Sequence, residues 1–120
     1  MATFKKFEEI LAWQKARKVT NKVYLVSSTG EFARDFGLRD QMRRAAVSIM
    51  ANIAEGHGRR TETEFANFLN FARGSAVEVQ SHLYVELDLD YINQADFDEI
   101  YETLSEISKM TISLAQYLRT

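Results

Sequence analysis

The 120-residue chain contains no cysteine and no proline, and it has only five glycines. Without cysteine it can form neither a disulfide-stapled fold nor a zinc–thiolate site. No apolar run approaches the roughly 18 residues of a transmembrane helix. The charged start, Phe4 to Glu9, lacks the apolar segment of a signal peptide. We therefore expect a single domain over residues 1–120 that is cytoplasmic and makes no membrane contact.

The net charge is small, but positive and negative residues are unevenly spread along the chain. The net charge of −2 combines a basic part, residues 1–73 with 13 Lys and Arg against 8 Asp and Glu, with an acidic part, residues 74–120 with 2 against 9. Two surfaces of opposite sign are therefore possible, and the net charge alone does not indicate the partner.

Apolar residues recur at intervals of three and four along the whole chain. This period predicts four helices, over residues 8–27, 38–55, 61–89 and 95–118. Gly56 is a candidate left-handed C-cap, Thr61 and Glu64 form a capping box, and Gly74 within a helix predicts close packing or a bend. Short connections favour an all-α, antiparallel up-down-up-down four-helix bundle.

Some large apolar residues fall outside the predicted core faces. The core face of the second helix is well defined, with Met42, Ala45, Ala46, Ile49 and Ile53. Six residues are left over: Tyr24, Leu25, Val47, Phe71, Tyr84 and Leu87. They indicate either a second buried face formed by self-association or ordinary exposed side chains.

A polar stripe runs beside the core face of the second helix. Its members are spaced by three or four residues: Gln41, Arg44, Ser48, Asn52 and Glu55. An antiparallel third helix would bring Ser75 and Glu78 opposite Arg44, with an ion pair between Arg44 and Glu78. The set fits a binding or catalytic groove, but a structural network is favoured, formed by Arg44, Ser48, Asn52, Glu55, Ser75 and Glu78.

The segment from Glu55 to Thr61 places Arg59 and Arg60 at the start of the third helix. Helix N-termini attract anions, so the loop is a candidate phosphate contact. Three further arginines precede it: Arg39, Arg43 and Arg44. The alternative is a glycine turn whose arginines pair with Glu55, Glu62 or Glu64.

No pattern of residues indicates catalysis, a metal or a cofactor. His57 and His82 are the only histidines, which is too few for a di-iron bundle. Ser75 lacks a nucleophile elbow and an evident histidine–acid partner. Aromatic residues at helical spacing are typical of a core rather than of base stacking; they are Trp13, Phe65, Phe68 and Phe71.

Several segments resemble the four-helix-bundle proteins encoded in 23S rRNA intervening sequences. They are Trp13 to Ala16, Gly37 to Ile49, Asn52 to Gly56 and Phe65 to Ser75. The resemblance implies an up-down bundle that assembles into a pentamer and is not an enzyme. A related group of retroelement accessory proteins binds nucleic acid and a reverse transcriptase. Carried onto this chain, that role falls to Arg39, Arg43, Arg44, Arg59 and Arg60.

Two hypotheses follow. The first is a non-catalytic homo-oligomer, pentameric by resemblance, that binds RNA or a reverse transcriptase-like ribonucleoprotein partner through these five arginines. The second is a protein–protein interaction scaffold that does not bind nucleic acid. Phosphate contacts make affinity fall steeply with salt, whereas an apolar protein interface changes little, so salt dependence separates the two.

Overall fold

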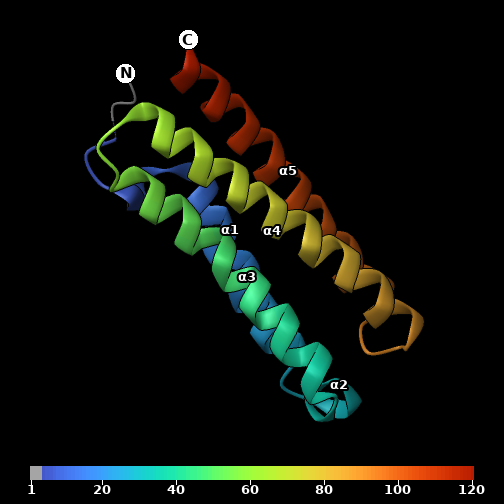
Figure 1. The fold of residues 1–120 in the computed structure, drawn as a ribbon. Coiled ribbons are helices and arrows are strands. Elements are labelled where there is room, and N and C mark those ends of the chain that lie inside the picture. Colours follow the sequence, from blue (N-terminus) through green and yellow to red (C-terminus); the bar gives the residue numbers. More distant parts are fainter. Residues whose placement is uncertain (1–3) are drawn as a thin grey trace.

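The structure, a computed structural model that describes residues 4–120, consists of helices joined by short connections. In chain order the elements are η1 (Phe7–Glu9), α1 (Leu11–Val26), α2 (Gly30–Arg34), α3 (Phe36–His57), α4 (Glu62–Asp88) and α5 (Gln94–Arg119). Figure 1 shows α3 and α4 as a long hairpin, with α1 beside α3 and α5 beside α4. The bundle is elongated, with principal extents of 46 × 20 × 19 Å. The predicted all-α class is confirmed.

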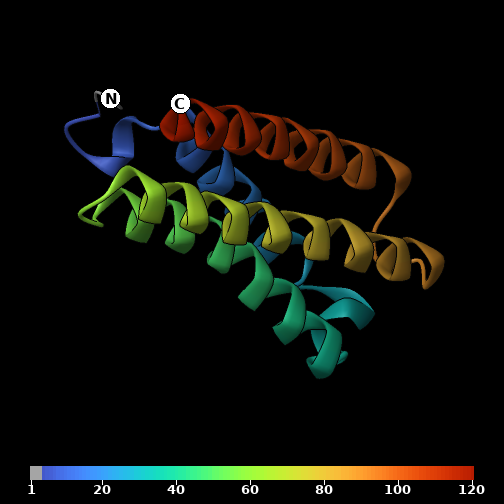
Figure 2. The same ribbon diagram turned by 45° about the horizontal axis from the view of Figure 1, so that its top comes forward.

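Contacts between the helices fix their directions. The Thr20 hydroxyl of α1 donates to the carbonyl of Ala46 at 3.2 Å, and the His57 ring at the end of α3 lies 3.0 Å from the carbonyl of Phe4. Since early residues of one segment meet late residues of the other, α1 and α3 are antiparallel. Figure 2 shows α3 and α5 on opposite sides of α4, and α5 also packs against α1. The chain therefore forms the expected up-down-up-down bundle.

The core follows the predicted apolar faces. All five predicted core residues of α3 are buried, and buried apolar side chains also line α4 and α5. Trp13 and Phe68 are only half-buried, because each lies at the edge of its helix's core face. Five of the six leftover residues are exposed, whereas Leu87 is half-buried and packs against the core.

The connection between α1 and α3 contains α2, a helix that the sequence did not predict. Gly30 begins it with a φ of 66°, in the left-handed region that favours glycine. Phe32 is buried and its ring stacks on Tyr91, with centroids 5.3 Å apart. The Tyr91 hydroxyl donates to Asp35 Oδ2 at 2.9 Å, and this hydrogen bond raises the pKa of Tyr91. These contacts tie α2 to the connection between α4 and α5.

Gly56 is not the predicted left-handed C-cap. It lies within α3, which continues to His57 and is capped by Gly58 at a φ of −79°. A Cβ at position 56 would lie 2.6 Å from Phe68 Cβ and 3.0 Å from Phe65 Cδ1. The residue is therefore needed because α4 approaches α3 closely at this point. Gly74, in contrast, has nothing within 4 Å of its would-be Cβ, and nothing in the structure explains it.

Thr61 caps α4 as predicted. Its hydroxyl accepts from the backbone N–H of Glu64 at 3.1 Å. The Glu64 carboxylate, however, accepts from the Thr61 hydroxyl at 3.1 Å rather than from the Thr61 backbone, so the capping box is closed through side chains.

Replacing Gly56 by alanine is expected to lower the free energy of unfolding by about 1–3 kcal/mol, because the added methyl group overpacks the α3–α4 contact. Gly74→Ala is the matched control. It fills open space in an exposed helix position and should raise stability by up to about 1 kcal/mol. Chemical denaturation of both variants measures the difference; equal stability of the two would contradict the close approach at Gly56.

Candidate nucleic-acid interface

The loop between α3 and α4 presents Arg59 and Arg60 differently. Arg59 donates to Glu55 Oε1 at 3.0 Å, and its guanidinium lies 4.6 Å from the centroid of the Phe68 ring. Arg60 is exposed and has no hydrogen-bond or ion-pair partner within residues 4–120. Beside the N-terminus of α4, a hollow of about 180 Å³ is lined by Phe4, His57, Arg59, Arg60, Thr61, Glu62 and Phe65. One arginine is thus neutralised by a glutamate, and the other remains available to an anion.

Arg39 is held near the start of α3. It donates to Asp40 Oδ1 and to the carbonyl of Ala33, both at 3.0 Å. Its guanidinium also lies 4.8 Å from the centroid of the exposed Phe36 ring. The Arg39 guanidinium is therefore held in place by contacts with neighbouring residues of the same chain.

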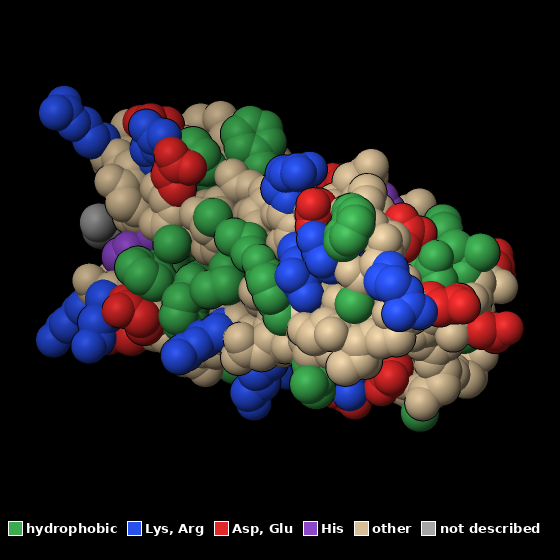
Figure 3. Space-filling view, turned by 90° about the horizontal axis from the view of Figure 1, so that it is seen from below, with side chains coloured by type: hydrophobic (Ala, Val, Ile, Leu, Met, Phe, Trp, Pro, Cys, Tyr) green, Lys and Arg blue, Asp and Glu red, His purple; other side chains and the backbone are tan. Residues whose placement is uncertain are grey.

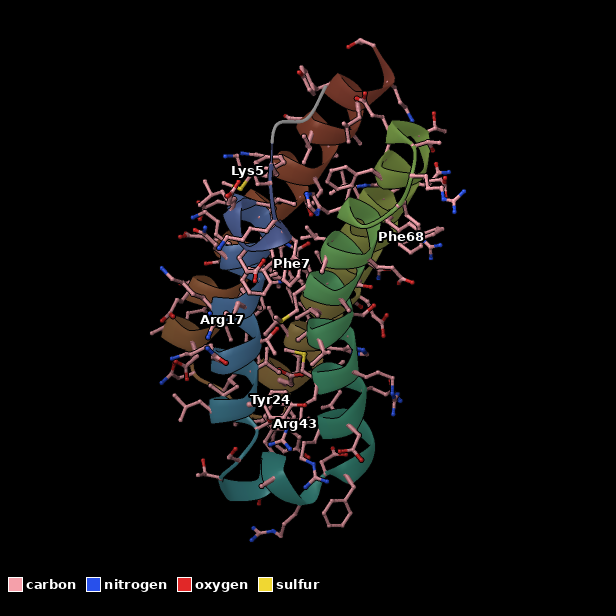
Figure 4. The ribbon with its side chains drawn as sticks, turned by 90° about the vertical axis from the view of Figure 1, so that its left-hand side faces the viewer. Lys5, Phe7, Arg17, Tyr24, Arg43 and Phe68 are labelled. Carbon is pink, nitrogen blue, oxygen red and sulfur yellow. The ribbon has the colours of Figure 1, made fainter. Side chains whose placement is uncertain are left out.

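Arg43 joins α3 to the end of α1. It donates to Ser27 Oγ at 2.8 Å, to the Ser27 carbonyl at 3.3 Å and to Ser28 Oγ at 3.3 Å. The guanidinium lies 4.5 Å from the centroid of the Tyr24 ring, and Figure 4 shows the two side chains together at one end of the α1–α3 face. Arg43 therefore stabilises the C-terminal end of α1 while its charge stays near the surface.

The predicted polar network forms in part. The Ser75 hydroxyl donates to Ser48 Oγ at 3.0 Å, and the Asn52 amide donates to the Ser48 carbonyl at 2.8 Å and to Ser48 Oγ at 3.0 Å. These three residues link α3 to α4. Glu55, the last member of the same stripe, accepts a hydrogen bond from Arg59 instead.

The expected ion pair between Arg44 and Glu78 is not formed. The two residues line the same hollow of about 160 Å³ with Gln41, Ala45, Ser48 and Ser75. Glu78 Oε2 instead lies 3.3 Å from His82 Nε2. His82 is one turn further along the same helix, so this contact needs no partner from α3. Arg44 has no partner in the described part of the chain and is exposed.

The acidic second half of the chain is partly neutralised by α1. Lys15 lies 3.1 Å from Glu106 of α5, and Lys22 lies 3.0 Å from Asp96 and 3.7 Å from Glu99. The acids of α5 that lie nearest α1 are therefore matched by lysines. Figure 3 shows the side of the bundle seen from below in Figure 1, where Lys and Arg side chains, with Asp and Glu among them, surround a strip of hydrophobic ones.

Sequence reasoning missed the pairing of arginines with aromatic rings. Four such pairs occur in the described chain: Arg17 with Trp13, Arg39 with Phe36, Arg43 with Tyr24 and Arg59 with Phe68. A spacing of three or four residues signals the first two pairs. The Arg43–Tyr24 pair joins α3 to α1, and the Arg59–Phe68 pair joins the loop after α3 to α4, so neither has a local signal.

Other kinds of site find little support. Within residues 4–120 no group of three or more histidines, aspartates or glutamates could hold a metal ion. None of the helices in that range is long and apolar enough to span a lipid bilayer. Ser75, the serine considered as a nucleophile, bonds another serine rather than a histidine.

The fold defines a helical bundle protein in which α1 and α3 each carry more cations than acids. Residues 8–113 match the family described as 23S rRNA-intervening sequence protein, and the chain belongs to that family. No curated protein matches it significantly.

A solved structure supports this assignment. It is a crystal structure at 1.70 Å resolution of a protein of unknown function from the S23 ribosomal protein family of Bacteroides thetaiotaomicron VPI-5482. The two chains are 25% identical and superpose with a TM-score of 0.80, over 88% of this chain and 98% of that one. Neither comparison identifies an enzyme.

Proposed function

We propose that this protein is a non-catalytic, cytoplasmic homo-oligomer that binds RNA or a reverse transcriptase-like ribonucleoprotein partner. The contact surface comprises Arg39, Arg43, Arg44, Arg59 and Arg60. The observation that carries the proposal is that all five belong to α3 or to the loop that follows it, and that α3 lies across α4 from the acidic helix α5. Cations concentrated on one helix and its following loop favour association with a polyanion.

Exposed apolar side chains on α4 support self-association. Phe71 is 58% exposed and Tyr84 is 52% exposed, and three more large residues also face solvent: Val77 and Val85 of α4, and Leu89, which caps its C-terminus. A surface of this kind is a candidate subunit interface. We propose a pentamer, following the family resemblance; light scattering of the purified protein measures the mass directly.

The double variant Arg59→Glu with Arg60→Glu is expected to abolish RNA binding while leaving the bundle folded, because both residues are exposed and the substitutions reverse two charges at the α4 N-terminus. The assay is binding of a labelled structured RNA at several salt concentrations, with light scattering on the same sample. Wild-type affinity should fall steeply as salt rises. Unchanged affinity of the variant would exclude this loop from the interface.

The second candidate function is a protein–protein interaction scaffold, which the exposed apolar face of α4 also favours. In that case the oligomer stays intact at low salt but binds no RNA. Its interactions with protein partners would change little with salt.

A further inference from the structure

One stripe of α1 carries aromatic and polar side chains toward solvent. Trp13, Arg17, Asn21 and Tyr24 are spaced by four, four and three residues, so they share one face of the helix. We call this set the α1 stripe. Trp13 is half-buried and the other three are exposed. Figure 4 shows Arg17 and Tyr24 following one another along this face. Of these four residues, none belongs to the predicted arginine surface.

A hollow of about 360 Å³ lies at the Trp13 end of the stripe. It is lined by Trp13, Gln14, Arg17, Lys18 and Asn21. Arg17 lies 5.8 Å from the centroid of the Trp13 ring. Asn21 and Lys18 have no hydrogen-bond or ion-pair partner in the described chain, and Gln14 donates to the Glu8 carbonyl at 2.9 Å, which leaves its own side-chain oxygen free to accept. The hollow thus combines one aromatic ring with two amides and two cations.

The other end of the stripe offers a second ring. Tyr24 is 42% exposed, and Arg43 lies 4.5 Å from its centroid. Hydrogen bonds to Ser27 hold that guanidinium in place, so the pair is preorganised. Eleven residues separate Trp13 from Tyr24, which corresponds to about 16 Å along the helix axis. Two stacking positions are therefore set a fixed distance apart.

The charge around the stripe is positive. Leu11–Val26 contains four cations and no aspartate or glutamate. Lys15 and Lys22 are paired with acids of α5, which leaves Arg17 and Lys18 without an acidic partner in residues 4–120. A ligand on the stripe therefore meets cations beside its rings.

We infer that the α1 stripe binds single-stranded RNA, with one base against Trp13 in the hollow, another against the Tyr24–Arg43 pair, and phosphates on Arg17 and Lys18. Aromatic rings beside a basic track are the chemistry by which single strands are bound. Gln14 and Asn21 can bond base edges, which in a duplex are already paired and stacked. A polyanion that offers charge alone would use the cations but would not stack on the rings. The inference rests on the proposed RNA-binding function and specifies the strand form and the position of the bases.

Trp13 is the only tryptophan, so its fluorescence reports this site alone. The test titrates the wild-type protein with a single-stranded RNA of about ten nucleotides, a length within the usual site size. The same RNA as a duplex, polyphosphate with the same number of phosphates, and poly-glutamate are titrated in parallel. The single strand should quench the fluorescence and bind most tightly. If polyphosphate or poly-glutamate binds equally well, the stripe recognises charge alone and the inference is overturned.

Two pairs of variants complete the test. Tyr24→Ala should bind the single strand about tenfold more weakly, as expected for the loss of one stacked base, whereas Tyr24→Phe keeps the ring and should bind like the wild type. Arg17→Gln should weaken binding and reduce the salt slope by about one, whereas Arg73→Gln, an exposed arginine of α4, should not. Circular dichroism confirms that each variant is folded.

The outcomes separate the inference from the proposed function. If single strand and duplex bind equally, without quenching and without an effect of Tyr24→Ala, the inference fails while salt-dependent RNA binding through the arginines stands. If no RNA binds at low salt, both fail.

Discussion

Replacing Glu86 by glutamine is expected to make the folded protein more stable above pH 8 and to flatten the pH dependence of its unfolding free energy. Glu86 lies in α4 with its side chain fully buried, at 0% exposure. Neither carboxyl oxygen has a hydrogen-bond partner in residues 4–120. Removal from water therefore raises the pKa of Glu86 from 4.5 to about 8.

The sign of the effect follows from the two pKa values. Below pH 4.5 the carboxyl group is protonated in both the folded and the unfolded chain. Between pH 4.5 and about 8 only the folded chain keeps the proton, so raising the pH favours unfolding. Above that window the loss of folding stability is complete and amounts to about 5 kcal/mol, at 1.36 kcal/mol per unit of pKa.

Urea denaturation at several pH values between 5 and 9, roughly the window in which a shifted carboxyl group titrates, measures this effect. The Glu86→Gln variant has no carboxyl group at this position, so its free energy of unfolding should not fall in this way as the pH rises. Glu102→Gln, which changes an exposed glutamate of α5, is the control and should follow the wild type. Parallel curves for the wild type and Glu86→Gln would show that the buried carboxyl group does not control stability.

Ile49→Asp is expected to abolish the folded bundle. Ile49 is fully buried in α3, between the buried residues Ala46 and Ile53. An aspartate there would place a carboxylate without a partner in the apolar core, a change whose effect exceeds about 4 kcal/mol and approaches the whole stability of a small domain.

Far-UV circular dichroism and thermal unfolding measure this outcome. Val47→Asp is the matched control, because Val47 is 40% exposed on the same helix and its replacement should leave the bundle folded. Ile49→Val should lower stability by about 0.5–1.5 kcal/mol. Full helicity and stability of Ile49→Asp would place the core on another face of α3.

The sequence predicted the long helices well because their stability comes from a repeated apolar spacing that any window of the chain displays. It did not predict α2, since five residues carry no helical period and Phe32 is held by Tyr91, which is distant in the chain. Gly56 was misinterpreted for a related reason. A glycine near a helix end normally indicates a C-cap. Here a glycine is needed for another reason, because Phe68 of α4 leaves no room for a side chain at position 56.

The candidate site was less predictable than the fold. The five arginines could be found as a cluster, but whether each one is free depends in part on neighbours that are distant in the chain, such as Ser27 for Arg43. A local signal did exist for Glu86, which follows Val79 and Leu83 at spacings of four and three on the core face. Its carboxylate made a surface position the natural expectation.

The contacts of α2 have a consequence for changes in chain length. Connections between helices commonly accept insertions, because little depends on their position. The segment between α1 and α3 is an exception: added residues near Thr29 would displace Phe32 from Tyr91 and separate Asp35 from the Tyr91 hydroxyl. The connection between α1 and α3 thus contacts the connection between α4 and α5. We expect related chains to keep the lengths of these two connections unchanged together.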